Sequence, residues 1–277
     1  MSRSIVLWII AVIITIASVM YQRVTGPTYP VRGEVAINGI SIVGVFDRNH
    51  SGETNHEVKV EVGRNDLTGN LYWKRYKTND DWTIVKMERE EDTLIGYLPG
   101  QPEAGKLVYK VIISNRTTEV QIPENPVIIR FKGEVPLYVL IPHILFMFGA
   151  LILSMRTGLE IFNKEPKYKT LTILTVIALF IGGMILGPIV QKFAFDAYWT
   201  GIPFGTDLTD NKTLIAFICW LVALYAVIEL KNPKIWIVIA FIVMILTYLI
   251  PHSVLGSELD YNKLDKQKQE QMNNTGN

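Results

Sequence analysis

Long apolar runs constrain this chain more than any other feature. Five of them have the length and polarity of membrane-spanning helices, and they extend over Ile5 to Met20, Leu137 to Met155, Leu171 to Val190, Leu214 to Leu230 and Ile235 to about Val254. Backbone groups inside hydrocarbon must be paired within the chain, so each run is expected to be a helix. Hydrophobic residues make up 49% of the chain, a high share for a soluble domain. The sequence therefore predicts an integral membrane protein.

The first run could serve as an anchor or as a signal peptide. It follows Arg3, but no good small-x-small cleavage site precedes the polar residues Tyr21, Gln22 and Arg23. We therefore expect residues 1–21 to be a retained N-terminal transmembrane anchor rather than a cleaved signal.

Basic residues in the short loops predict the orientation, because Lys and Arg resist translocation. The segments 156–169 and 231–234 are basic, with Arg156, Lys164, Lys167 and Lys169 in the first and Lys231 and Lys234 in the second. Segment 191–212 instead sets two lysines against three aspartates. The N-terminus is thus expected in the cytoplasm of a bacterial cell, with residues 22–134, segment 191–212 and the C-terminus outside the cytoplasmic (inner) membrane.

A different pattern fills the region between the first and second runs. Short alternating strands, such as Val58, Val60 and Val62 on one face, are separated by turn residues such as Asn79-Asp80-Asp81. Seven or eight such strands in about 100 residues indicate an all-β sandwich of immunoglobulin or fibronectin type III character. The expected fold is therefore a five-helix membrane bundle with this sandwich, residues 22–134, inserted between helices 1 and 2. Residues 135–257 form the four-helix part, and the polar tail 258–277 is expected to be disordered.

Composition excludes several classes of partner and cofactor. The formal net charge is +1 and no basic stripe alternates with aromatic residues, so no nucleic-acid partner is expected. The single cysteine, Cys219, cannot form an intrachain disulfide, and the chain has no Cys/His zinc spacing or CxxCH motif. Disulfide scaffolds, zinc fingers and covalently attached haem are therefore excluded.

The outer loop after the third run carries the densest set of candidate binding residues. Between Gln191 and Thr213 it holds five aromatic, three acidic and two basic residues. One interpretation is a binding surface for a ligand or partner protein, made by Asp196, Trp199, Asp207, Asp210 and Lys212. The alternative is structural: the aromatic residues form an interfacial belt, and the aspartates cap the next helix.

Histidines suggest a second candidate site. The tripeptide Ile-Pro-His occurs at 141–143 and again at 250–252, so His143 and His252 could approach each other near the outer leaflet. Two imidazoles on different helices can ligate haem b or hold a metal, although each can also be satisfied by a carbonyl or water. In the exported domain, His50 and His56 flank a polar loop and are expected to be solvated, with a metal pair as the alternative.

The outer loop also carries a resemblance. Residues 198–213 read YWTG-x-PFG-x-DLTDNKT, and Gly187-Pro188 and the first Ile-Pro-His precede them. This pattern resembles an uncharacterised family of bacterial multi-pass membrane proteins with an exported immunoglobulin- or fibronectin-like domain. The resemblance implies a bacterial envelope location and covers most of the chain, but it implies no catalytic residues.

These observations favour a binding or accessory protein of the bacterial envelope, which engages a membrane or envelope partner through its extracytoplasmic surface and lies in the lipid bilayer. An enzyme is not favoured, since no catalytic motif is present, although paired aspartates suffice for acid/base chemistry. The alternative is a membrane redox protein that binds haem b or a metal through His143 and His252. A transporter or channel component is weaker, because the runs show no inverted repeat.

Overall fold

The computed structural model describes residues 2–37, 39–63, 65–115, 117–252, 254 and 256–275. The chain folds into two compact units, each assembled from two separate stretches of sequence. Unit 1 combines Met1–Pro27 with Val135–Ser257 and is helical, whereas unit 2 combines Thr28–Glu134 with Glu258–Asn277 and holds the strands. The chain therefore has a mixed architecture of helices and two β-sheets.

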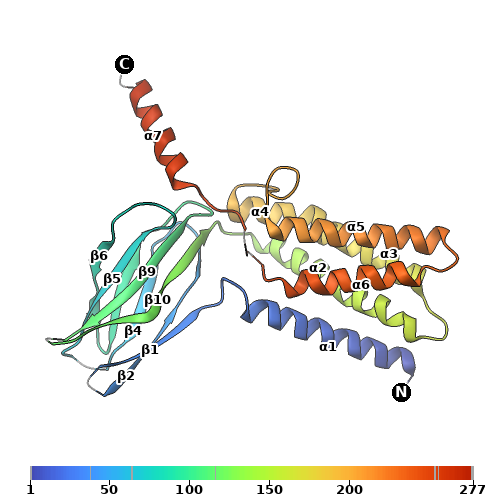
Figure 1. The fold of residues 1–277 in the computed structure, drawn as a ribbon, viewed down its shortest axis with the longest axis horizontal. Coiled ribbons are helices and arrows are strands. Elements are labelled where there is room, and N and C mark those ends of the chain that lie inside the picture. The colour runs from blue at the N-terminus through green and yellow to red at the C-terminus, as the bar shows by residue number, and fades with distance from the viewer. Residues whose placement is uncertain are drawn as a thin grey trace. The chain divides into compact units, whose positions relative to one another are not determined.

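Unit 1 is a bundle of apolar helices that run side by side (Figure 1). Its elements are α1 (Arg3–Val24), α2 (Leu137–Leu159), η1 (Glu160–Phe162), α3 (Tyr168–Leu179), η2 (Phe180–Leu186), α4 (Gly187–Phe195), α5 (Leu208–Glu229) and α6 (Lys234–Leu249). Among the described residues, four helical segments are long and apolar enough to cross a membrane, namely Arg3–Thr25, Leu137–Phe162, Tyr168–Phe195 and Leu208–Glu229. These segments indicate that the protein is associated with a membrane.

The helix count and order differ from the predicted five transmembrane helices. The segment Tyr168–Phe195 is divided by the π-helical element η2, and the expected fifth span is the shorter helix α6 of 16 residues. Helix α6 ends at Leu249 instead of near Val254 because Pro251 follows: a residue before proline is disfavoured in helical conformation. Ile250 accordingly has extended backbone angles.

Small residues let the helices of unit 1 approach closely. Trp220 is fully buried at the centre, and alanines from α1, α2, α5 and α6 surround the same core. In such bundles small residues bring backbones together, so dispersion and close packing hold the helices. Gly158 marks the tightest contact, because a Cβ at that position would collide with the ring of Phe241.

Unit 2 is built from two five-stranded sheets around one apolar core. The first sheet has the order β1 (Val31–Ile37), β2 (Ile40–Phe46), β4 (His56–Glu61), β8 (Thr93–Leu98) and β7 (Glu88–Glu90). The second has the order β3 (Asn49–Ser51), β10 (Glu119–Lys132), β9 (Lys106–Ser114), β5 (Thr68–Arg75) and β6 (Thr83–Lys86). All pairings are antiparallel except β3 with β10.

The alternating residues predicted from the sequence face this core. Val58, Val60, Leu71 and Val111 are buried and belong to one cluster that draws on both sheets. Register between β5 and β9 pairs Leu71 with Val111 on the inner face and Tyr72 with Lys110 on the outer face. Because successive side chains alternate between faces, the outer face of this sheet is polar and aromatic.

The C-terminal tail differs from the expectation of disorder. Residues Tyr261–Thr275 form helix α7, and the stretch from Glu258 onward belongs to unit 2. Asp260 starts the helix, since its Oδ1 accepts hydrogen bonds from the amides of Asn262 (3.1 Å) and Lys263 (3.2 Å). No proline or glycine interrupts the segment, and Tyr261 anchors it by burial against the sandwich.

Candidate functional site

The loop between α4 and α5 is held by side chains from the first turn of α5. Asp210 Oδ2 accepts hydrogen bonds from the backbone amides of Thr200 (2.7 Å) and Gly201 (3.0 Å). Asn211 Oδ1 accepts another from the amide of Ile202 (2.7 Å). A loop whose amides are satisfied in this way has a defined conformation, because opening it would leave polar groups unpaired.

Asp207 joins the same loop to the segment that follows α6. Its Oδ1 caps α5 by accepting from the amide of Thr209 (2.8 Å), and its Oδ2 accepts from the amide of Ser257 (2.9 Å). The hydroxyls of Thr200 and Ser257 lie 3.0 Å apart beside this carboxylate. We call Thr200, Asp207, Asp210 and Ser257 the loop cluster. Both aspartates are buried, so their oxygens serve the fold rather than face solvent.

The end of the loop exposes large apolar side chains despite this tight anchoring. Phe204 is 82% exposed, and Tyr198 and Ile202 are each 61% exposed; these three residues form the loop tip. Trp199 supports the tip from within, because its Nε1 donates to the carbonyl of Ile202 (3.0 Å). Asp196 lies at the start of the loop in left-handed conformation, exposed and paired with Lys192 at 2.6 Å.

Lys212 does not belong to the loop surface. Its ammonium is buried and donates to the carbonyl of Ile250 at 2.6 Å, and Gln22 Nε2 donates to the same carbonyl at 3.2 Å. That carbonyl follows the last turn of α6, where helical partners are missing. A cavity of about 20 Å³, lined by Lys212, Gln22 and His252 among others, lies beside this contact and has room for one water molecule.

The two histidines of the repeated tripeptide, His143 and His252, both lie in unit 1. His252 interacts electrostatically with His143, Lys212 and Asp207. His143 Nδ1 lies 2.9 Å from the carbonyl of Gly182, and since a carbonyl only accepts, Nδ1 carries the proton. Gly182 lies in the π-helical element η2, and its carbonyl also accepts from the amide of Gly187.

These histidines do not fit a haem. The adjacent cavity has room for about one water molecule, and a porphyrin is many times larger than a water molecule. Within the described part of the chain, no group of three or more His, Cys, Asp or Glu side chains is arranged to hold a metal ion. The pair thus supplies at most two ligands in a space too small for the cofactor.

An ion pair at the opposite end of α2 escaped sequence analysis. Arg156 Nη1 lies 2.5 Å from Glu160 Oε1, and both side chains are buried. Glu160 Oε2 accepts from the Asn163 side chain (3.1 Å) and the Lys167 amide (3.0 Å), while the Arg156 guanidinium stacks over Trp8. The sequence signal that could have revealed this pair is the spacing of Arg156 and Glu160, a base and an acid four residues apart at the end of an apolar run. This pair ties α1 to the connection between α2 and α3.

In unit 2, His50 and His56 form a direct contact instead of two solvated side chains. Their Nδ1 atoms lie 3.3 Å apart, and His56 Nε2 lies 3.9 Å from Asp47 Oδ2. His56 is buried, and burial lowers its pKa below the ordinary value although the carboxylate of Asp47 opposes the shift.

The predicted site residues thus fall into three groups. Asp207 and Asp210 meet in the loop cluster, Asp196 and Trp199 lie along the exposed loop, and Lys212 lies with the histidines beside the cavity. Thr200, Ser257 and Gln22 were not predicted, because single hydroxyl and amide residues carry no sequence signal of their own. No protein-family model matches the chain, and no curated protein matches it.

Proposed function

We propose that the protein is a membrane-anchored binding or accessory protein of the bacterial envelope, which engages a partner protein through its extracytoplasmic surface. The loop tip carries this proposal. Phe204, Ile202 and Tyr198 are exposed although Asp210 and its neighbour hold the loop rigidly. A connection that only reverses the chain needs no such support, and ordered apolar side chains with a polar rim are typical of protein contacts.

A partner protein suits the loop tip better than the lipid acyl region does. Asp196 lies two residues before Tyr198, and its side chain is 78% exposed next to Lys192. Sinking the tip into hydrocarbon would carry this ion pair toward a medium in which charges are costly. A protein surface can bury the apolar tip and leave the charged rim in water, as interfaces commonly do.

Contacts inside unit 2 support an arrangement with five crossings. Lys106 Nζ pairs with Glu258 Oε2 at 2.5 Å, which supports a topology with the sandwich and the tail on the same side of the membrane. The number of crossings between Glu134 and Glu258 must then be even. Three long segments lie between them, and α6 is therefore inferred to be the fourth crossing. At 1.5 Å per residue its length is about 24 Å, which a bilayer can accommodate by local thinning.

The strand order supports the immunoglobulin-like interpretation of unit 2. In that fold one sheet has the order A-B-E-D and the other contains G-F-C. Strands β2-β4-β8-β7 and β10-β9-β5 reproduce these orders when numbered along the chain. Domains of this type commonly act as exported binding modules, although the fold alone does not specify a function.

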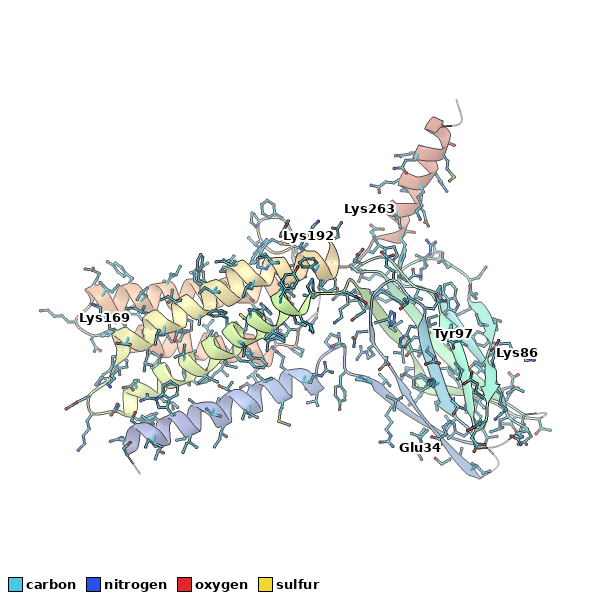
Figure 2. All side chains as sticks on the ribbon, turned by 180° about the vertical axis from the view of Figure 1, so that it is seen from behind. Glu34, Lys86, Tyr97, Lys169, Lys192 and Lys263 are labelled. Carbon is cyan, nitrogen blue, oxygen red and sulfur yellow. The ribbon has the colours of Figure 1, made fainter. Side chains whose placement is uncertain are left out.

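Cysteine labelling would test the orientation. In a Cys219→Ala background, Lys263→Cys reports on the tail and Lys169→Cys on the start of α3; Lys169 lies at the opposite end of its helical segment from Lys192 (Figure 2). A membrane-impermeant maleimide should label position 263 but not position 169 in intact spheroplasts. Labelling of 169 alone would refute an outer sandwich, and labelling of both after lysis serves as the control for reactivity.

Site-specific photo-crosslinking would test the function. A photoreactive phenylalanine analogue at position 204 should give a discrete protein adduct in native membranes, and Asp210→Ala should abolish it by releasing the loop. The same analogue at Phe162, which is 55% exposed and lies on the opposite end of the bundle, serves as the control. Adducts with lipid only at position 204 would refute a protein partner.

A further inference from the structure

The C-terminal tail occupies a charged site on unit 2. Glu258 bridges two lysines, with Oε1 2.8 Å from Lys77 Nζ and Oε2 2.5 Å from Lys106 Nζ. Burial alone would raise the pKa of Glu258, but these two hydrogen-bonding cations hold the pKa below its ordinary value. One carboxylate therefore forms ion pairs with two separate cations, which is a more specific contact than a single exposed ion pair.

The first turn of α7 adds an aromatic and a second acidic contact. Tyr261 is buried, donates its hydroxyl to Gln101 Oε1 (2.9 Å), and lies under the Arg75 guanidinium at 5.2 Å from the ring centre. Arg75 also donates to Asp265 (3.0 Å), while Asp80 holds the other edge of the guanidinium. Because Asp80 orients Arg75 in advance, the site is prepared for the incoming carboxylate.

The tail therefore presents three contact residues in a fixed spacing. Glu258, Tyr261 and Asp265 follow the pattern Glu-x-x-Tyr-x-x-x-Asp, in which the last two are one helical turn apart. The backbone of the tail also contacts the sandwich, because the amide of Leu259 donates a hydrogen bond to the carbonyl of Ala104 (3.0 Å). Residues 266–273 of α7 are exposed, whereas Glu258, Tyr261 and Asp265, which make the contacts described above, lie in the first part of the tail.

A cationic strip continues from this site along the outer face of the same sheet. Lys106 belongs to β9, and Lys110 on the same outer face lies over the rings of Tyr72 (5.6 Å) and Trp82 (5.1 Å). Lys74 of β5 also lies over the Trp82 ring, with its Nζ 5.3 Å from the ring centre. In the part of the chain that the structure describes, neither Lys74 nor Lys110 has a carboxylate partner. The strip therefore offers more positive charge than the tail neutralises.

We infer that this face of unit 2 is a recognition site for acidic, tyrosine-containing peptide segments of a partner protein, and that the tail occupies it as an intramolecular competitor. The site binds a Glu-x-x-Tyr-x-x-x-Asp segment at Lys77, Lys106, Gln101 and Arg75. A partner with further acidic residues gains contacts with Lys110 and Lys74, which the tail does not make. The inference rests on contacts within unit 2 and does not depend on the loop tip or on membrane orientation.

Peptide binding in detergent tests this inference. A fluorescein-labelled peptide of residues 257–275 should bind protein truncated after Ser257, with a Kd that weakens as salt increases. Intact protein should bind it about tenfold more weakly, given an effective tail concentration near 1 mM and an intrinsic Kd near 0.1 mM. Lys77→Gln and Lys106→Gln should weaken binding to the truncated protein, whereas Lys86→Gln, an exposed lysine on β6, should not.

Two further samples keep the test decisive. If truncation prevents folding, the full-length double variant Glu258→Gln and Asp265→Asn frees the site without deletion, and it should bind the native peptide as the truncated protein would. A scrambled peptide of equal composition should bind at least tenfold more weakly than the native sequence. Equal binding of both peptides would overturn pattern recognition, and no binding to either freed form, with a normal unfolding transition, would overturn the site itself.

Discussion

Replacing Asp210 by alanine should open the loop between α4 and α5 without unfolding the bundle. The substitution removes the acceptor of two backbone amides, a partly buried one of Thr200 and a buried one of Gly201. Each buried donor left unpaired costs about 1–3 kcal/mol, and water entering the vacated space recovers part of that cost, so the net effect should be about 3 kcal/mol. At about 1.4 kcal/mol per factor of ten, the open population should rise by a little over a hundredfold.

Limited proteolysis measures this opening directly. Chymotrypsin cuts after aromatic residues, and Tyr198 and Phe204 lie within the loop. When closing is faster than cutting, the cleavage rate follows the open population, so Asp210→Ala should be cut about a hundredfold faster in detergent. Mass spectrometry of the fragments would identify the cut sites, and an unchanged far-UV circular dichroism spectrum would show that the helices remain.

Two substitutions control this experiment. Asp196→Asn removes the charge of a carboxylate in the same loop whose ion pair with Lys192 is exposed, and asparagine tolerates the left-handed conformation of this position, so the cleavage rate should not change. Asp210→Asn keeps one acceptor oxygen and should fall between alanine and the parent. A cleavage rate for Asp210→Ala within threefold of the parent would refute the reasoning, because it would mean that these two hydrogen bonds do not hold the loop closed.

Three further outcomes are expected. Glu160→Ala should destabilise the bundle by about 3–5 kcal/mol in an SDS unfolding titration, because the charge of Arg156 is left buried and unpaired. Joint replacement of both residues by Leu and Met should cost far less stability, and an equal loss of stability in the two variants would contradict this reasoning. The pKa of His56 is lowered in the fold, so this side chain binds fewer protons in the folded than in the unfolded state. The stability of unit 2 should therefore fall as pH drops below about 6.5. Thermal melts at pH 7.5 and 5.5 should show this loss, and His56→Gln should make it smaller. Protein from haem-replete cells should show no reduced-minus-oxidised visible band, and a band lost in both His143→Ala and His252→Ala would reverse our view of the cavity.

Periodic features of the sequence predicted much of the fold. The alternation of Val58 and Val60 marked an inner strand face, and the long apolar runs marked the helices of unit 1. Both signals arise from burial, which repeats along the chain. The end of the last helix was misjudged because Pro251 acts on the residue before it, a local effect that outweighs hydropathy.

The candidate site was less predictable because its contacts join distant positions. Asp207 and Asp210 were chosen for their charge, but the partner that gives them a structural role, Ser257, lies about fifty residues away and has no motif. The same holds for Glu258 and Lys106, which only tertiary structure brings together. Composition indicated a polar, disordered tail, since a helix held by one anchored turn leaves no apolar periodicity to detect.

Division of unit 2 between two distant stretches of sequence has a consequence for biosynthesis. In the proposed orientation the strands reach the outside first, while residues 258–265 are made only after α2 to α6. In that orientation a chain that stalls before the tail would lack it, and a chain that fails to insert one helix would leave the tail on the opposite side of the membrane from the sandwich; in both cases Arg75, Lys77 and Lys106 would stay uncovered. In the proposed orientation, docking of the tail would thus require that all helices between the sandwich and the tail have inserted, and a sandwich without its tail would be more open to proteases.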